Sequence, residues 1–158
     1  MVYGIHGVCR IVDEEKRVID RKRVSYLVLE PLGQPGSKYL VPTHNETAMG
    51  KLKAMLSREE MECLLRSPEI RNNAWIQDEG ARKQTYRELI SSGDRERLME
   101  MVHTLYLHRD RQAEVGKKCH MCDENFIRDA EKLLAGEVSV VLDMDPGEAR
   151  LYLRQVLQ

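Results

Sequence analysis

The chain is poor in aromatic residues and in the features that mark secreted or membrane proteins. Its 158 residues include one Trp, one Phe and four Cys. Four dispersed cysteines are too few for the disulfide framework of a small secreted domain, so we expect reduced thiols. No apolar run approaches the ~20 residues that cross a bilayer, and no basic and then apolar leader opens the chain. We therefore expect a cytoplasmic protein with no membrane segment and a core built mainly from Leu, Val, Ile and Met.

Catalytic motifs are also missing from the sequence. It has no GxGxxG, P-loop, nucleophile elbow or HExxH motif, and its acidic residues are mostly interleaved with Lys and Arg. His6 could act as a base, but a turn histidine hydrogen-bonded to backbone is the more frequent case. The sequence therefore predicts a protein that is not an enzyme and that uses no cofactor.

One short motif, Cys-His-Met-Cys at 119–122, has the spacing of a metal site. Two thiolates two residues apart can share a tetrahedral zinc, but the sequence has no second ligand pair of that kind. We therefore expect no bound metal and favour thiols packed at a helix start with Asp123 as N-cap. A zinc- or redox-responsive protein that uses Cys119 and Cys122 remains the alternative.

The first third of the chain has the pattern of short β-strands. β-branched and aromatic residues fill 24–30 and 38–41, and glycines bracket a turn between two short strands in 2–12. Residues 13–23 are highly charged, and we expect them to form a connection. Several short strands with tight turns favour a small antiparallel barrel, which we place at residues 1–56.

From residue 57 onward the pattern is helical. Ser57 and Glu60 have the spacing of a capping box, and Gly93 is expected to end a helix. Further helix starts are expected at Asp94, Asp123 and Asp145. The sequence thus predicts an α+β protein of two domains, in which a compact all-helical domain of about five helices spans 57–158.

Positive charge is unevenly distributed along the chain. Residues 1–56 carry nine Lys/Arg against six Asp/Glu, whereas 57–158 carry sixteen against twenty. The total charge argues against a conventional nucleic-acid binder. Residues 71–118 nevertheless carry ten Lys/Arg against eight acids, and they contain the single tryptophan, Trp75.

Trp75 lies in a polar, turn-prone connector. Its ring can be presented to a partner, or it can fold back over a core edge. The basic residues around it can face a phosphate backbone, or they can be ordinary solvated helix faces. The candidate DNA contacts are Trp75, Arg71, Arg82, Lys83, Arg87, Lys117 and Lys118.

Six short motifs follow one another along the chain. They are Val-Tyr-Gly-Ile-His-Gly-Val at 2–8, Tyr-Leu-Val-Leu at 26–29 with Leu-Val-Pro at 40–42, the Trp75 connector, residues 86–89 with Ser-Gly-Asp at 92–94, Gly-Lys-Lys at 116–118, and Ala-Glu-Lys-Leu-Leu at 130–134 after Asp-Glu at 123–124. In this order and spacing they resemble the CarD/CdnL family of bacterial RNA polymerase-binding transcription regulators. The resemblance covers nearly the whole chain.

The resemblance implies a Tudor-like (SH3-like) amino-terminal barrel that docks on the β-subunit lobe of RNA polymerase, followed by a helical DNA-binding domain. In the family, a tryptophan reaches the minor groove at the upstream edge of the transcription bubble, and Trp75 matches that residue. Arg17 and Leu40 match polymerase-contacting positions, and we add the neighbouring Val41.

Three departures from the family pattern concern individual contacts. The segment between Trp75 and Tyr86 is longer than in well-known members and contains acidic residues. Asp129 stands where some relatives carry a basic DNA contact. A few residues that usually precede Val2 are missing, so we expect a short first strand.

The expected function is that of a non-enzymatic regulator that stabilises the promoter open complex. Its partners would be the RNA polymerase β subunit and promoter DNA, the latter bound in the minor groove with weak sequence preference. We expect a monomer associated with the nucleoid through polymerase, with a strand-swapped dimer as an alternative. In a second interpretation, the helical half binds another protein and Trp75 anchors in a groove of that partner.

Overall fold

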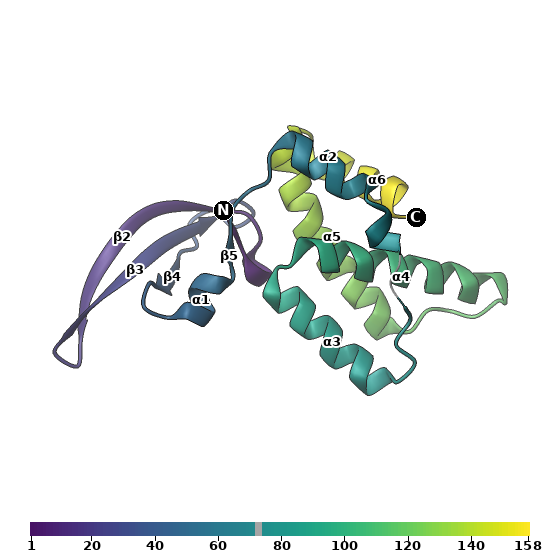
Figure 1. Cartoon of the computed structure of the whole chain (residues 1–158), viewed down its shortest axis with the longest axis horizontal. Helices are drawn as coiled ribbons and strands as arrows, with labels where there is room; N and C mark the ends of the chain where they lie inside the picture. Colours follow the sequence, from purple (N-terminus) through teal and green to yellow (C-terminus); the bar gives the residue numbers. More distant parts are fainter. Residues whose placement is uncertain (72–73) are drawn as a thin grey trace.

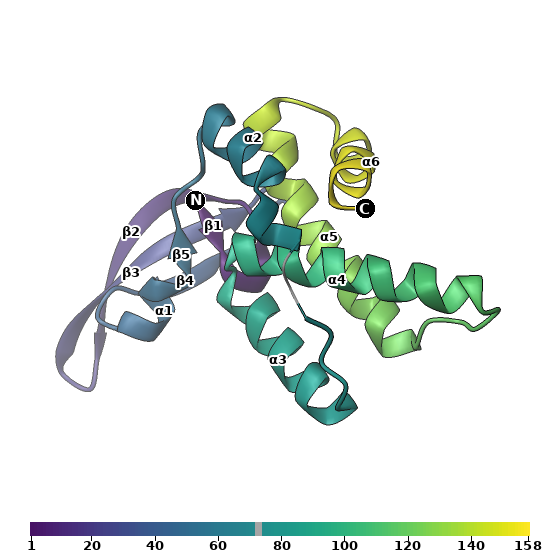
Figure 2. The same cartoon turned by 45° about the vertical axis from the view of Figure 1, so that its right-hand side comes forward.

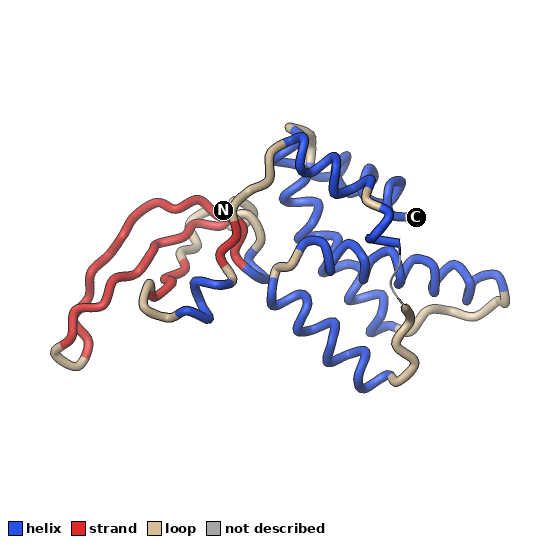
Figure 3. The backbone as a smooth tube through the Cα atoms, in the orientation of Figure 1, coloured by secondary structure: helices blue, strands red, loops and turns tan. Residues whose placement is uncertain are grey.

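Strands gather at one end of the molecule and the long helices at the other in a computed structural model that describes residues 1–71 and 74–158 (Figure 1, Figure 3). The strands are β1 (Val2–Tyr3), β2 (Cys9–Ile19), β3 (Lys22–Pro31), β4 (Tyr39–Pro42) and β5 (Leu52–Lys53). The α-helices are α1 (Glu46–Gly50), α2 (Arg58–Arg66), α3 (Glu79–Ser92), α4 (Arg95–Glu114), α5 (Met121–Leu142) and α6 (Pro146–Leu157), and the 3-10 turns are η1 (Gly4–His6) and η2 (Pro68–Arg71). This arrangement confirms the expected α+β class. Within the described residues, no helix combines the length and the apolar character that crossing a membrane requires.

The strands of the described chain form two antiparallel sheets. One sheet has three strands in the order β2-β3-β4, and the other pairs β1 with β5. The small core beneath them contains Cys9, Leu29 and Val41, each at most 2% exposed, and α1 packs beside it. β4 and β2 are therefore the two edges of the three-stranded sheet.

The β2–β3 hairpin corrects the expectation that residues 13–23 are a connection. β2 runs on to Ile19 and pairs with β3 down to Lys22, and the hairpin extends away from the rest of the molecule (Figure 1). Asp20 and Arg21 form the turn, both with positive φ (50° and 64°), which is the backbone of the turns that match the twist of hairpin strands. Most of β2 is solvent-exposed, so its charges hide the alternating pattern that identifies a half-buried strand.

Helices α2 to α6 surround one hydrophobic core. Met61, Leu65, Met99, Leu105 and Val138 are among its fully buried members. Figure 2 shows α4 and α5 running close together with α6 near one end of α5. The expected count of about five helices beyond residue 57 is thus confirmed.

Local signals set most helix ends, as the sequence predicts. Ser57 and Glu60 form a reciprocal capping box, with hydrogen bonds of 3.1 and 2.7 Å. Gly93 ends α3 in the left-handed conformation, and Asp94 caps α4. A second capping box joins the side chain of Asp145 to α6.

The charged residues 109–114 continue α4 to Glu114, because charged residues remain helical when they face solvent. One helix start differs from expectation. α5 begins at Met121 with His120 as N-cap, so Asp123 lies inside the first turn and is not the cap. The side chain of Asp123 is fully buried, and its partner explains why.

Specific contacts join the strand end to the helical end. The η1 turn packs against α3, and the Lys51 amine lies 3.4 Å from the Ser91 hydroxyl. Arg95 donates to the carbonyl oxygen of Ala54 at 2.7 Å and pairs with Glu137 at 2.9 Å. The segment between β5 and α2 is therefore held against the start of α4.

Candidate nucleic-acid interface

Trp75 lies against the surface of the helical core. Its ring is partly buried and is stacked on His108, with 3.6 Å between ring centres and 7° between planes. The guanidinium carbon of Arg82 lies 4.4 Å from the centre of the Trp75 ring. Of the two alternatives for Trp75, the structure thus shows the ring folded over the core edge: a large apolar ring gains by covering α4, and part of it remains exposed.

Arg82 is an internal residue, which corrects its placement on a solvent-facing basic stripe. It is 3% exposed, and its guanidinium donates to both carboxylate oxygens of Asp123, at 3.2 and 3.3 Å. A third hydrogen bond, of 3.0 Å, reaches the carbonyl oxygen of Ile76 in the connector. A buried guanidinium requires such partners because its loss of hydration is expensive. Arg82 thus ties the connector beside Trp75 to α3 and α5.

The other predicted basic residues remain at the surface, but some of them have internal partners. Lys83 pairs with Glu79 one turn earlier, and this hydrogen bond raises the pKa of Lys83 and lowers that of Glu79. Arg71 donates to the carbonyl oxygens of Ser67 and Val156, at 3.2 and 3.1 Å, so it fastens η2 to the last turn of α6. These contacts reduce the availability of Lys83 and Arg71 to a phosphate.

Arg87, Lys117 and Lys118 are exposed and form no ion pair with another described residue. Both lysines lie in the loop between α4 and α5, where the backbone N–H of Lys117 donates to the carbonyl oxygen of Gln112 at 2.8 Å. Of the predicted cations, these three are the best placed to contact phosphate. Whether they bind DNA stays a prediction.

A cavity of about 370 Å³ opens beside Trp75, and sequence reasoning did not find it. Its lining consists of Trp75, Gln77, Thr104, Leu107, His108, Arg111 and Gln112. Five of these residues come from α4 at spacings of three, four, seven and eight, so they share one face of that helix. That spacing was visible in the sequence, but the fold was needed to show that the connector lies over it.

The predicted polymerase-binding residues lie on the three-stranded sheet. Arg17 is exposed on β2, where it pairs with Glu15 at 2.8 Å and lies 6.0 Å from the ring centre of Tyr26. Leu40 is partly exposed on the edge strand β4. Val41 is 0% exposed and belongs to the small core, so only its backbone could pair with a partner at the sheet edge, and polymerase binding at Val41 stays a prediction. Successive side chains of a strand point to opposite faces, and Val41 faces inward.

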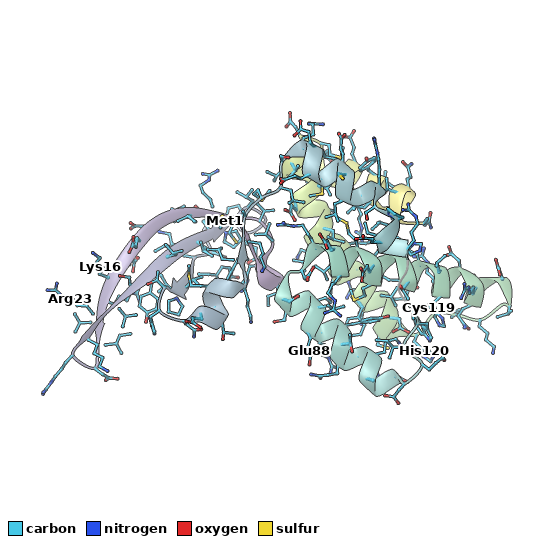
Figure 4. The ribbon with its side chains drawn as sticks, in the orientation of Figure 1. Met1, Lys16, Arg23, Glu88, Cys119 and His120 are labelled. Atoms are coloured by element: carbon cyan, nitrogen blue, oxygen red, sulfur yellow. The ribbon has the colours of Figure 1, made fainter. Side chains whose placement is uncertain are left out.

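The remaining chemical candidates have structural explanations. His6 stacks on Tyr3 and lies tilted against Tyr39, with ring centres 5.6 and 3.8 Å away, and burial lowers its pKa. Burial raises the pKa of Cys119 to about 11, which keeps the thiol protonated at neutral pH. Figure 4 labels Cys119 beside His120 in the helical end of the molecule. Within the described residues, no three His, Cys, Asp or Glu side chains converge as a metal site, so the zinc alternative lacks a ligand set there.

Comparison with known families assigns the strand end of the molecule. The family model described as CarD-like/TRCF RID domain matches residues 1–53. This stretch contains all five strands and α1. Residues 1–53 are therefore a CarD-like RNA polymerase-interacting domain. No curated protein matches the chain.

Proposed function

From the premise that residues 1–53 are a CarD-like RNA polymerase-interacting domain, we propose that the protein is a non-enzymatic bacterial regulator that stabilises the promoter open complex. Residues 1–56, as a Tudor-like barrel unit, dock on the β-subunit lobe of polymerase. Residues 57–158 form the unit that contacts promoter DNA. The part-exposed, stacked Trp75 is the observation that carries this proposal.

Two features of the sheet support docking. β4 is an edge strand, and an edge offers backbone N–H and C=O groups to a strand of a partner. The hairpin tip adds exposed cations, and Figure 4 labels Lys16 and Arg23 there. Val18 and Ile19, which are 70% and 47% exposed, give the same tip an apolar surface. A basic and apolar tip suits a partner surface that combines acidic and hydrophobic residues.

The charge of the helical unit explains why docking on polymerase would precede contact with DNA. Residues 57–158 carry sixteen Lys/Arg against twenty Asp/Glu, so free duplex DNA should bind weakly. Attachment to polymerase raises the effective DNA concentration to roughly the millimolar range. A few phosphate contacts by Arg87, Lys117 and Lys118 can then suffice.

Trp75 supplies the preference for melted DNA in this proposal. Stacking of an aromatic ring on an exposed base stabilises a complex by about 1 to 3 kcal/mol, and the energetic cost is lowest where bases are already unstacked. A preference of ~1.4 kcal/mol for open over closed DNA shifts the equilibrium about tenfold. Because Trp75 is packed on His108, the exposed part of the ring, rather than a free wedge, meets the bubble edge.

The test compares open-complex lifetimes with the wild-type protein, Trp75→Ala and Trp75→Leu. The leucine variant keeps apolar packing on α4 but cannot stack on a base. Both variants should lose most of the lifetime increase while still binding polymerase in a pull-down with the β lobe. If Trp75→Leu lengthens the lifetime as the wild type does, the ring has no role at the bubble.

A second candidate function rests on a cleft of about 650 Å³ between α2 and the start of α4. Its lining includes apolar Leu56, Leu64 and Ile70 and acidic Glu60, Glu96 and Glu100. A lining of apolar residues with more acidic than basic side chains suits a basic peptide with a hydrophobic anchor. In this version the helical unit binds a protein, and crosslinking to promoter DNA in the ternary complex separates the two: DNA crosslinks favour the first function.

A further inference from the structure

The outer edge of β2 is open over most of its length. β2 is an edge of the three-stranded sheet, and Met1 covers only its start, through hydrogen bonds of 2.8 and 3.2 Å with the backbone of Cys9. Beyond a bulge at Val12, residues 13–19 pair regularly with β3 and are exposed, apart from the partly buried Glu15. An edge strand of this kind offers its outward N–H and C=O groups to a further strand.

The side chains of this edge are complementary to their own reverse order. From residue 11 to residue 19 the chain has two apolar residues, three acids, two bases and two apolar residues. If a second copy of β2 runs antiparallel with Glu15 facing Glu15, every other pair within 12–18 is apolar or oppositely charged: Val12 with Val18, Asp13 with Arg17, and Glu14 with Lys16. Directly opposed pairs of both kinds stabilise antiparallel strands.

Two-fold symmetry restricts the register of such a pairing. The axis must pass through a residue that faces its own counterpart, because an axis between residues would place N–H against N–H. A centre at Glu14 opposes the acids Asp13 and Glu15. A centre at Lys16 opposes Glu14 to the apolar Val18. Of these registers, the one centred on Glu15 alone matches charge with opposite charge on both sides of the axis.

Charged side chains on an edge strand usually prevent pairing with other chains. In β2 the three acids precede the two bases, so the acids of one copy meet the bases of the other. The one like-charged pair is Glu15 with Glu15, and each Glu15 already pairs with Arg17 of its own chain at 2.8 Å. The hairpin also extends away from the helices, so they do not cover this edge (Figure 1, Figure 2).

We propose that β2 pairs with β2 of a second copy of this chain, antiparallel and centred on Glu15, so that two three-stranded sheets join into one of six strands. Each copy keeps its own strands, which distinguishes this dimer from a strand-swapped one. The contact is short, so self-association should be weak and concentration-dependent. Pairing covers Arg17, so a dimer and a polymerase complex compete for β2; this consequence, unlike the pairing, rests on the proposed function.

The experiment measures sedimentation of the full-length protein over a concentration series. Lys16→Glu and Glu14→Lys each create two like-charged pairs across the axis, so each variant alone should self-associate at least about tenfold more weakly than the wild type. In a mixture of the two variants, both pairs are again oppositely charged, so dimers should return on mixing without unfolding. Lys132→Glu makes the same charge change as Lys16→Glu at an exposed site on α5 and should leave self-association unchanged.

Two substitutions at Glu15 test the register. Glu15→Gln removes the like-charged pair and should tighten self-association about two- to fivefold. Glu15→Cys, in a Cys63→Ser background that removes the exposed thiol, should form a disulfide between copies, because directly opposed Cα atoms lie about 4.5–5.5 Å apart. Lys16→Cys in the same background should crosslink poorly, since its counterpart lies diagonally at roughly 7–8 Å.

Any of four results would overturn the pairing. The wild type and Glu15→Gln could both remain monomeric up to about 1 mM protein. The two charge-reversed variants could self-associate as the wild type does, or their mixture could form dimers only after unfolding and refolding, which indicates strand exchange. Lys16→Cys could crosslink as readily as Glu15→Cys.

Competition with polymerase is measured separately, by adding the isolated β lobe to the dimer. We expect the dimer to dissociate into complexes with one copy of this chain each. A complex that holds two copies would refute the competition and leave the pairing intact. If the β lobe does not bind at all, the proposed docking fails, and the sedimentation and crosslinking results still decide the pairing.

Discussion

Gly93 packs so closely against Gly4 that a β-carbon on Gly93 would lie 3.3 Å from the Cα atom of Gly4. Both residues have positive φ, 66° and 42°. The contact is made by backbone atoms, so no flexible side chain can move aside. It packs η1, the first turn of the polymerase-interacting domain, against the carboxyl end of α3.

Substitution of alanine at Gly93 should therefore cost more than the left-handed backbone alone. Gly116 is the matched control, because its φ is 71° and an added β-carbon would meet nothing within 4 Å. We expect Gly116→Ala to lower the free energy of unfolding by about 1 kcal/mol. Gly93→Ala should lower it by a further ~1–2 kcal/mol through steric conflict with Gly4. Urea unfolding measures both, and equal losses would show that the close contact is unimportant.

Removing the negative charge beside Arg82 should be strongly destabilising. Asp123→Asn leaves a guanidinium that is 3% exposed without its carboxylate, and breaking a buried pair in this way typically costs about 3–5 kcal/mol. Since Arg82 also holds the connector at Ile76, Trp75 should become more exposed and its emission should shift to longer wavelength. Urea unfolding and the native-state spectrum test the two effects.

The control for Asp123→Asn is the exposed ion pair of Lys83, the residue that follows Arg82, with Glu79. Lys83→Met breaks the pair with Glu79 at the surface, and exposed pairs contribute little because water screens them. We expect no measurable change in unfolding free energy or emission. A loss as large as that of Asp123→Asn would mean that burial does not distinguish the two pairs.

Local chemistry made most helix ends predictable, and long-range pairing made the interior of the site unpredictable. The Ser57 cap and the Gly93 terminus depend on residues at most three positions apart, which a sequence displays directly. The pair of Arg82 and Asp123 spans 41 residues. Each looked like an ordinary surface charge or cap, since only the packing of α3 on α5 brings them together.

The strand domain shows a different limit of sequence reasoning. The β2–β3 hairpin was missed over residues 13–23 because both faces of β2 are largely solvated and its charges carry no period of two. Val41 was predicted to bind polymerase as the neighbour of Leu40, although alternation along a strand places adjacent side chains on opposite faces and its side chain is buried. The sequence therefore predicted a small antiparallel β-domain, which the structure shows as two sheets and not as a closed barrel, and its binding face stays a prediction.

Acidification should weaken folding through His108. Burial lowers the pKa of His108; Arg82, His120 and Arg111 lower it further, while Asp123 raises it. Its folded pKa lies below the unfolded value of about 6.5, so the unfolded chain binds more protons as pH falls below that value. The contribution of neutral His108 to stability is fully present above about pH 6.5 and is lost at lower pH, by at most ~1.4 kcal/mol per pH unit for one proton.

The measurement is unfolding free energy between pH 5 and 7 for the wild type and His108→Gln. His6, whose pKa is also lowered by burial, is present in both proteins and cancels in the comparison. The wild type should lose more stability than His108→Gln on going to pH 5. If both proteins lose the same unfolding free energy between pH 7 and pH 5, packing of His108 against Trp75 does not oppose its protonation.

Substitutions of two adjacent residues of β4 should affect domain stability and polymerase binding differently. Val41 is fully buried in the small core, so Val41→Ala should lower the free energy of unfolding of the strand domain by about 2 kcal/mol. Leu40 is partly exposed at the sheet edge, so Leu40→Ala should cost less stability and should weaken binding to the β lobe.

Arg17→Glu reverses an exposed charge and should slow association without unfolding the domain, whereas Arg128→Glu, an exposed residue of α5, should leave association unchanged. Association rates with the isolated β lobe distinguish these variants. If Arg17→Glu and Arg128→Glu associate equally fast, the hairpin is not the docking surface, and the edge of β4 must carry the interaction by itself.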